Sequence, residues 1–273
     1  MQAFLNSCRD AGITPVENSL DCDAVVIWSV LWNGRMSKNK RIYHHYRSLG
    51  KPVLVIDAGS LERDVTWKIA VNNITSEGYY GHTENLDLDR PAKLGVTLQN
   101  NKLNDKILIA AQHNKSLQWE GMPGLEDWTV DLIHKIRQYS ERHIVVRYHP
   151  RCPFFIPTQR FKMLLMNKVI ENCTLETPMQ IESTYDAFNI DYNYHCVINH
   201  SSGPGINAVI AGSNVIVDTK SLAYPMSIAL EEIENPPKKK NKEKWLVEIS
   251  HTEYTVDEIA EGLWLKRLKD SLV

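Results

Sequence analysis

Short apolar runs alternate with helix-like stretches along the chain. Residues 23–28 and 52–57 are continuous apolar runs that predict buried strands, and a helix is predicted between them over 38–49, ended by Gly50. Apolar strands separated by helices are typical of parallel pairing in a sheet covered on both faces. The first hundred residues therefore predict a small α/β unit.

The pattern restarts after residues 81–105, a polar stretch that we interpret as a loop and linker. The second series predicts strands at 106–111, 143–148, 195–198 and 214–218, a short strand at 168–170, and helices at 125–139 and 205–211. A last helix is predicted to begin at Thr255, which forms a capping box with Glu258. These elements predict an α/β fold throughout.

The composition is that of an ordinary globular protein. The 273 residues include 31 Lys+Arg and 33 Asp+Glu, and 43% are hydrophobic, which excludes a disordered tail or a fibrous repeat. No run reaches the roughly 20 apolar residues of a membrane helix, and residues 1–12 lack the apolar core of a secretory signal. Five widely spaced cysteines without a CxxC pair predict reduced thiols and a cytoplasmic location.

The most informative segment is 197–217, where a strand, a turn of small residues and a helix follow one another. The free N–H groups and the dipole at a helix start bind anions, and small residues let a phosphate approach the backbone. The candidate phosphate ligands here are Asn199, Ser201, Ser202, Gly203 and Asn207. The alternative is a tight strand–helix connection that binds no ligand.

Two further polar segments follow predicted strands. Arg147, His149 and Arg151 follow one strand, and their guanidinium and imidazole groups suit phosphate oxygens. Gln112 and Lys115 follow another strand, and Lys115 has the reach to bind a phosphate. We expect these residues to converge with the 199–205 turn on one anion, the alternatives being a solvated strand end and an ordinary polar loop.

The His149-Pro150 pair after a strand, followed about fifty residues later by Ser201-Ser202 and a short helix, resembles the donor domain of GT-B glycosyltransferases, with capsule- and sialyltransferase-type motifs. The resemblance covers residues 106–270. It implies that His149, Ser201 and Ser202 hold the donor's phosphate. It also implies a GT-B-like fold of two small Rossmann-like domains with a cleft between them and a C-terminal return helix. The expected domains are an acceptor-side domain (1–104), a nucleotide-sugar donor domain (105–252) and a helix that packs back on the first domain (253–273).

The same resemblance implies a catalytic base in the first domain, because inverting transfer needs a group that deprotonates the acceptor hydroxyl. Asp57, Glu62 and Asp64 follow the second predicted strand, and Asp57 is the first choice because its strand ends at the expected cleft. The alternative is that Asp57 only caps the turn through Gly59. Whether the anomeric centre is retained or inverted is left open.

An acid-free basic stretch indicates the acceptor. Residues 31–51 contain six Lys/Arg and no Asp or Glu, interleaved with aromatic residues. This is the pattern that a phosphate backbone and an extruded base require. The candidate acceptor-binding residues are Arg35, Lys38, Arg41, His44 and His45. The alternative is a solvated helix face.

The sequence thus predicts a glycosyltransferase that takes a sugar from a UDP- or CMP-linked donor, with no cofactor beyond this co-substrate. No DxD metal motif stands out, so metal-independent chemistry is expected. By analogy with phage DNA-modifying glycosyltransferases, the first hypothesis for the acceptor is a hydroxymethylated pyrimidine in DNA, in the host cytoplasm. The alternatives are a capsule-type glycan transferase and a catalytically silent nucleotide- or nucleic-acid-binding module. The oligomeric state is left open.

Overall fold

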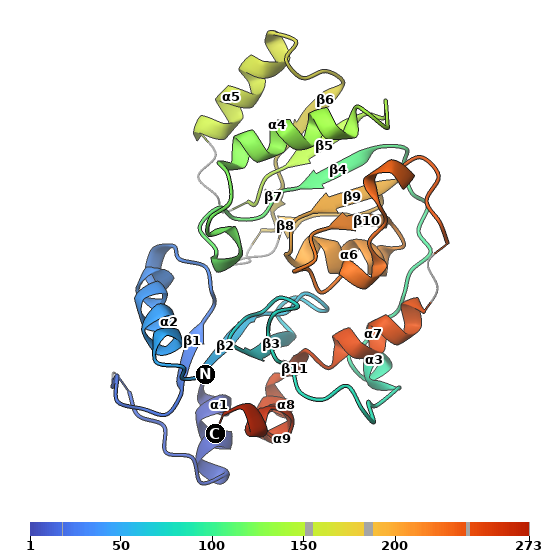
Figure 1. Cartoon of the computed structure of the whole chain (residues 1–273). Helices are drawn as coiled ribbons and strands as arrows, with labels where there is room; N and C mark the ends of the chain where they lie inside the picture. Colours follow the sequence, from blue (N-terminus) through green and yellow to red (C-terminus); the bar gives the residue numbers. More distant parts are fainter. Residues whose placement is uncertain (18, 151–154, 183–187, 239–240, 273) are drawn as a thin grey trace. The chain divides into compact units, whose positions relative to one another are not determined.

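The structure is a computed structural model, and it describes residues 1–17, 19–150, 155–182, 188–238 and 241–272. The chain divides into two compact units (Figure 1), and the α/β class is confirmed for both. The first unit comprises Met1–Thr97 and Glu243–Val273, and the second comprises Leu98–Lys242. The sequence places these boundaries a few residues later, after 104 and 252.

The first unit is built on a four-stranded mixed sheet of order β1-β2-β3-β11. The strands β1 (Val25–Trp28) and β2 (Val53–Ala58) are parallel, as predicted, and α2 (Asn39–Ser48) connects them. β3 (Thr66–Val71) and β11 (Glu253–Thr255) pair antiparallel and were not predicted. Both missed strands begin in polar segments, so neither shows the continuous apolar run of the first two.

One face of this sheet packs against helices from both ends of the chain. These are α1 (Gln2–Asp10), α8 (Val256–Ala260) and α9 (Leu263–Leu268). The rings of Phe4 and Trp264 stack with centroids 4.4 Å apart. The capping box of Thr255 and Glu258 is confirmed, but the single predicted helix is wrong, because the chain turns at Gly262 with a φ of 70°.

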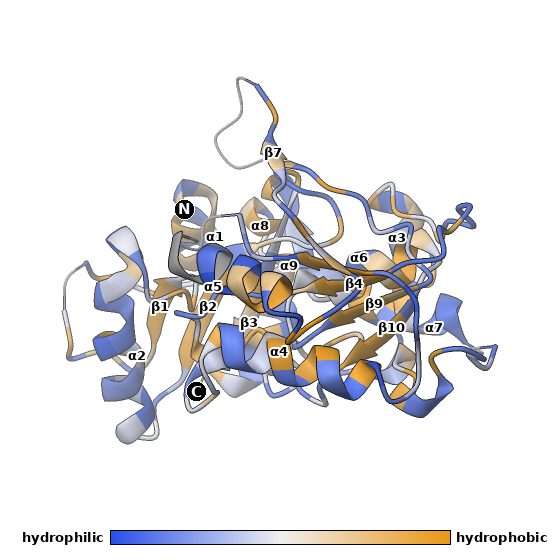
Figure 2. Ribbon diagram, turned by 90° about the horizontal axis from the view of Figure 1, so that it is seen from above, coloured by the Kyte–Doolittle hydropathy of each residue, from blue (hydrophilic) through white to orange (hydrophobic). Residues whose placement is uncertain are grey.

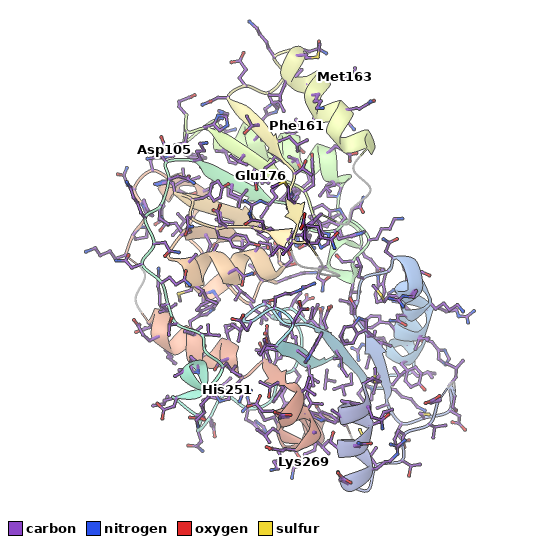
Figure 3. All side chains as sticks on the ribbon, turned by 180° about the vertical axis from the view of Figure 1, so that it is seen from behind. Asp105, Phe161, Met163, Glu176, His251 and Lys269 are labelled. Carbon is purple, nitrogen blue, oxygen red and sulfur yellow. The ribbon has the colours of Figure 1, made fainter. Side chains whose placement is uncertain are left out.

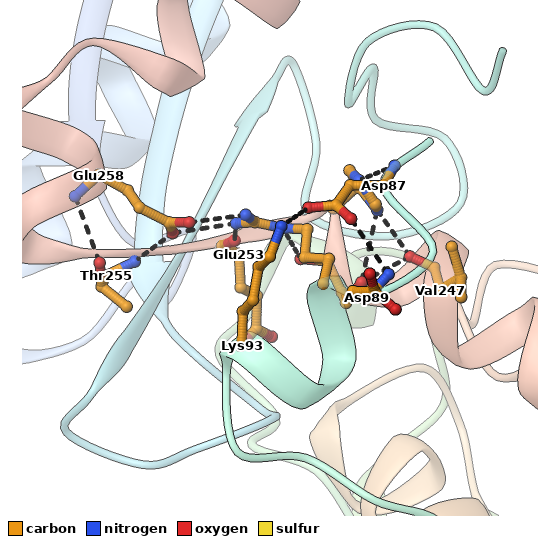
Figure 4. Close-up of polar contacts among 10 residues, drawn as sticks. Asp87, Asp89, Lys93, Val247, Glu253, Thr255 and Glu258 are labelled. Atoms are coloured by element: carbon orange, nitrogen blue, oxygen red, sulfur yellow. Dashed lines mark hydrogen bonds and ion pairs between the residues drawn. The ribbon is translucent and has the colours of Figure 1, made fainter. Parts of the chain in front are cut away.

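The segment predicted as a loop and linker is fastened to the C-terminal part of the first unit. It contains the short helix α3 (Arg90–Lys93), whose Arg90 is buried, and Figure 4 shows polar contacts in this region, with Glu253 and Glu258 labelled. The guanidinium donates to the carbonyl of Ser250 (2.7 Å), to that of Glu253 (2.6 Å) and to both carboxylate oxygens of Glu258 (2.6 and 3.0 Å). The helix α7 (Lys242–Ser250) and β11 are thereby held to residues near 90.

The second unit is a five-stranded, all-parallel sheet of order β10-β9-β4-β5-β6, typical of a Rossmann-like domain. Its strands are β4 (Ile107–Ala110), β5 (Ile144–Arg147), β6 (Cys173–Glu176), β9 (Cys196–Asn199) and β10 (Asn214–Val217). Four of them were predicted. The short strand predicted at 168–170 is wrong, because Lys168 and Asn172 adopt positive φ angles and make this segment a turn before β6.

The α-helices described in the second unit are α4 (Leu125–Ile136), α5 (Phe155–Met166) and α6 (Gly203–Ala211), and β7 (Met179–Gln180) pairs antiparallel with β8 (Phe188–Asn189). Phe161 of α5 is buried in the core and Met163 of the same helix is exposed, as their labels in Figure 3 allow the reader to follow. Figure 2 shows the strands as largely apolar and α2 as the most continuously polar helix. The four described cysteines carry free thiols.

Candidate functional site

The strand order of the second unit brings three predicted polar segments together. β9, β4 and β5 are adjacent and parallel, so their carboxyl ends meet at one edge of the sheet. Gln112 follows β4, His149 follows β5, and the Ser201-Ser202 turn follows β9. This is the edge at which open α/β sheets bind their ligands.

Two buried amides fasten the serine turn to the end of β4. The Gln112 Oε1 accepts from the backbone N–H of Ser201 (3.1 Å) and lies 3.3 Å from its hydroxyl. The Asn199 Oδ1 accepts from the N–H of Ser202 (2.8 Å), while its Nδ2 donates to the carbonyl of Ala110 (2.6 Å). The structure thus makes Gln112 and Asn199 supports of the turn, and leaves the serine hydroxyls as its partly exposed groups.

Three histidines surround this turn, two of which were missed as site residues. The rings of His113 and His149 lie 5.3 Å apart, and the His200 ring packs against Trp119 at 5.5 Å. Burial lowers the pKa of His200, whose Nδ1 lies 2.8 Å from the Ser201 hydroxyl. His113 and His200 were visible in the sequence, since each directly follows a residue that was selected.

The tautomer of His113 follows from its neighbours. Its Nδ1 accepts the backbone N–H of Lys115 at 3.0 Å, so the neutral ring carries its proton on Nε2. The Lys115 side chain itself is exposed. The local turn over 113–116 therefore orients the His113 ring rather than bringing the Lys115 ammonium to a defined place.

Arg147 is buried and bonded to other groups of the protein. It is 4% exposed, and its guanidinium donates to Glu176 (2.8 Å) and to the carbonyl of Asp191 (2.8 Å). Burial raises the pKa of Tyr194 to about 12, so its hydroxyl stays protonated and donates to Glu176 at 3.0 Å. Glu176, labelled in Figure 3, lies at the end of β6. This network directs Arg147 to protein groups, and donor binding by Arg147 stays an untested prediction. Arg151 lies outside the described residues.

The helix that follows the turn has a defined start. Ser202 is the N-cap of α6, Gly203 is its first residue, and Asn207 lies partly exposed one turn further on. A Cβ on Gly205 would lie 3.0 Å from Val217 and 3.4 Å from Ala223. The small residue at 205 therefore serves the packing of α6 on β10, a different reason from the close phosphate approach that the sequence suggests.

Among the three carboxylates predicted in the first unit, Asp57 is the most enclosed. It is the last residue but one of β2, and its carboxylate accepts from the Ser29 hydroxyl (3.0 Å) and from the Ala58 N–H (2.8 Å). Burial raises the pKa of Asp57. Glu62 and Asp64 are exposed. The alternative role of Asp57 was to cap the turn through Gly59. The Gly59 N–H donates to the Thr66 carbonyl (3.0 Å) and not to Asp57, which accepts the Ala58 N–H instead.

Ser29 and Glu253 also shape this edge and were missed by sequence reasoning. Ser29 has a φ of 62°, a conformation that non-glycine residues adopt rarely. Glu253 is fully buried and bonds to the loop after Asp57 from a strand almost 200 residues away. No local sequence signal indicates such a distant pairing.

The basic stretch lies on η1 (Gly34–Lys38) and α2. The five predicted acceptor residues, Arg35, Lys38, Arg41, His44 and His45, are all exposed. Lys51 differs, since its ammonium donates to the Cys22 carbonyl at 2.7 Å. The buried Tyr43 and Tyr46 are the core-facing residues of α2. The solvated-face alternative is compatible with this arrangement, and so is a surface for a polyanion.

No group of three or more His, Cys, Asp or Glu side chains suited to a metal ion occurs in the part of the chain that the structure describes. No helix among those residues has the length and apolar character needed to cross a membrane.

Comparisons with known proteins give matches among solved structures only. No family model matches the chain, and no curated protein matches its sequence. Two similar structures are the β-Kdo 2,7 and β-Kdo 2,4 transferases of KpsC from Thermosulfurimonas dismutans. The first is 12% identical, with a TM-score of 0.40 over 94% of this chain and 86% of that one. The second is 11% identical, with a TM-score of 0.44 over 92% and 90%.

A third similar structure is a UDP-GlcNAc 2-epimerase from Methanocaldococcus jannaschii in complex with UDP-GlcNAc and UDP. It is 14% identical, with a TM-score of 0.36 over 91% of this chain and 76% of that one. At these sequence identities and TM-scores, the similarity is one of fold alone. The assignment of both units to the α/β class rests on their strand order and pairing.

Proposed function

We propose that this protein is a glycosyltransferase that moves a sugar from a nucleotide-sugar donor to a hydroxyl acceptor. The observation that carries the proposal is the convergence of Gln112, His149 and the Ser201-Ser202 turn on one edge of the second unit's parallel sheet. His149, Ser201 and Ser202 are the positions at which the sequence resembles the donor domains of GT-B enzymes. The donor's phosphate binds at this edge.

The chemistry of the edge suits a phosphate in several ways. The hydroxyls of Ser201 and Ser202 donate to Gln112 and Asn199 in this structure and can rotate to donate to a phosphate instead. The start of α6 adds the positive end of a helix dipole. The imidazoles of His113 and His149 supply further donors. Hydroxyl, imidazole and dipole together can stabilise a leaving nucleotide phosphate, whether it is a UDP or a CMP.

In the proposed reaction, the first unit supplies the base. The acceptor O–H transfers its proton to Asp57 as its oxygen forms a bond to the anomeric carbon. The bond between that carbon and the phosphate oxygen breaks, and the nucleotide leaves with the electron pair. A carboxylate whose pKa is raised by burial is a stronger base than an exposed one, which favours Asp57 over Glu62 and Asp64.

For the acceptor we propose a polyanion that contacts the exposed basic residues of η1 and α2. The first candidate is DNA bearing a hydroxymethylated pyrimidine, since a phosphate backbone complements an acid-free basic helix. The second candidate is an acidic glycan of the capsule type, which the His149-Pro150 and Ser201-Ser202 motifs favour. Both candidates use the same donor site.

Donor binding is tested first, by thermal shift of the full chain against a panel of UDP- and CMP-sugars, because a bound donor raises stability by mass action. Ser201→Ala and Ser202→Ala should each weaken binding. Ser140→Ala is the matched control: Ser140 is bonded to Glu234 (2.5 Å) and precedes β5, at the opposite edge of the sheet. Equal binding by all three variants would overturn the donor site.

Transfer is tested next, by nucleotide release with acceptors added. Sugar incorporation into hydroxymethylated but not unmodified DNA would establish the first acceptor, and incorporation into an acidic oligosaccharide would establish the second. Arg35→Ser with Lys38→Ser should weaken acceptor binding and flatten its salt dependence. Donor binding without release on any acceptor would favour the silent binding module.

A further inference from the structure

A row of three charged residues crosses the sheet of the first unit. Lys68 of β3 is the register partner of Asp57 on β2 and of Glu253 on β11. Both strand pairs are antiparallel, and residues directly opposite in such pairs lie on one face with neighbouring side chains. The candidate base is thus the first member of a buried acid–base–acid row whose other members the proposed reaction does not use.

Glu253 fastens the turn that follows Asp57. Its carboxylate accepts from the N–H of Ser60 (2.7 Å), the N–H of Leu61 (3.1 Å) and the hydroxyl of Thr66 (2.7 Å). Gly59 has no room for a side chain, because a Cβ there would lie 2.6 Å from the Glu253 Oε2. The end of β2, where Asp57 lies, is therefore built around a carboxylate supplied by the C-terminal strand.

Lys68 is held between groups of this same row. Its side chain is 7% exposed, and its ammonium donates to the Ser60 hydroxyl (3.2 Å) and lies 3.8 Å from the Glu253 Oε1. Asp57 is bonded by Ser29 and Ala58 and is attracted by the Lys68 charge. The other charged or titratable groups that act on this carboxylate or its row are Arg63 and Tyr80.

We propose that Glu253 and Lys68 are positioning residues for Asp57. Glu253 fixes the turn after β2 and anchors the Lys68 ammonium, and Lys68 places a positive charge beside the Asp57 carboxylate. A buried carboxylate needs such a neighbour to be ionised and ready to accept a proton. This inference rests on the proposed role of Asp57 as the base, and it assigns a function to a strand that reaches the site from the other end of the chain.

The test is a carbon-detected NMR titration of the Asp57 carboxyl in the full chain, with Asp57→Asn for assignment. Lys68→Met removes the positive charge and should raise the proton affinity of Asp57 at least about threefold. Glu253→Gln removes a negative charge and releases the Lys68 ammonium towards Asp57, so it should lower that affinity by a similar factor. Opposite shifts are the signature of the row, since a purely structural role moves neither titration.

Glu258→Gln is the matched control, because it also converts an ion-paired carboxylate of the first unit, the partner of Arg90, to an amide. It should leave the Asp57 titration unchanged. An unchanged titration in Lys68→Met, or shifts of the same sign in both row variants, would overturn the proposal. If Glu253→Gln does not fold, Lys68→Met decides alone.

The titration needs no substrate, so its outcome is independent of transferase activity. Opposite shifts in a chain that transfers no sugar would uphold the row and refute the proposed function. Where transfer is detected, the acid limb of kcat/KM should move to higher pH in Lys68→Met. If Lys68→Met transfers sugar and the acid limb of its kcat/KM profile lies at the same pH as in the unaltered protein, the proposed role of Lys68 is refuted and the proposed function stands.

Discussion

The carboxyl edges of the two sheets are built in different ways. In the second unit, buried amides hold the serine turn, and Asn199 does so from three residues away. In the first unit, the turn after Asp57 is held by Glu253, whose bond to Ser60 spans 193 residues of chain. The serine turn is held by neutral amides, whereas the turn after Asp57 is held by a buried carboxylate.

This difference has an energetic consequence. A neutral amide that is hydrogen-bonded costs little to bury, whereas a buried carboxylate or guanidinium is costly once its partners are removed. The first unit should therefore depend on its polar contacts more steeply than the second. It should also lose its candidate base if the C-terminal strand detaches, since Glu253 comes from that strand.

The largest effect is expected from removing a buried guanidinium in either unit. Arg90→Met removes the guanidinium that pairs with Glu258 and should destabilise the first unit by about 3 kcal/mol. Arg147→Met removes the guanidinium that pairs with Glu176, but this carboxylate is more exposed and keeps its bond from Tyr194, so the second unit should lose less. Hydrogen exchange locates the damage. Faster exchange in 87–94 and 250–258 is expected for the first variant, and in β5 and β6 for the second. Damage spread evenly over the chain would contradict the division into two units.

A pair of glycines compares the two edges directly. Gly59→Ala places a Cβ 2.3 Å from the backbone oxygen of Thr66, which cannot give way, and should destabilise the first unit by about 3 kcal/mol. Gly205→Ala meets side-chain atoms alone, the nearest being the Val217 methyl at 3.0 Å and the Ala223 methyl at 3.4 Å, and should cost about 1 kcal/mol. Chemical denaturation of both variants measures the difference, and equal losses would show that the two turns are equally crowded.

A charge placed on an amide support tests the second edge. Gln112→Glu keeps the acceptor for the Ser201 N–H but adds a negative charge beside the proposed phosphate site. Donor affinity should fall about tenfold, or about 1.4 kcal/mol, and stability should fall as well, because residue 112 is buried and burying a new carboxylate charge is costly. The control is Gln138→Glu, an exposed position past the end of α4. Donor affinity unchanged in Gln112→Glu would show that the donor phosphate does not bind next to Gln112.

The two carboxyl edges also differ in how much of each could be predicted from the sequence. The strand–turn–helix around Ser201 was recognised because a buried parallel strand, small residues and a helix C-cap at Gly212 lie consecutively. The residues selected there do lie together. What the spacing did not reveal is that Gln112 and Asn199 face the turn and that Arg147 faces Glu176, because these choices depend on the neighbouring strands.

In the first unit, Asp57 was located from its strand, but its surroundings were not. β3 alternates polar and apolar residues over only its first four positions, and β11 has three residues, the last of which is the N-cap Thr255. Neither shows a hydrophobic period long enough to predict. The pairing of Lys68 with both acids exists only once these strands are in register.

The smallest effect expected is a difference in acid sensitivity between the units. Burial lowers the pKa of His251 below its ordinary value of 6.5, with Arg90 and Arg267 adding to the shift and Asp87 opposing it. The unfolded chain therefore binds a proton first as the pH falls. The stability contributed by neutral His251 is complete above about pH 6.5 and is lost as the pH drops below that value.

His200 of the second unit also has a lowered pKa, but its contact differs. The His251 Nε2 accepts a hydrogen bond from the backbone N–H of Asp87 (3.2 Å), and this donor cannot turn away when the ring is protonated. The His200 Nδ1 faces the Ser201 hydroxyl, which can rotate to accept a hydrogen bond from the protonated ring. Between pH 7 and 5, hydrogen exchange should therefore accelerate around residues 87 and 247–251 before it does so around residue 200. His251→Gln should remove the first response alone. If hydrogen exchange accelerates first around the serine turn, the Ser201 hydroxyl does not compensate for the protonation of His200. The carboxyl edge of the second unit is then the more acid-sensitive of the two.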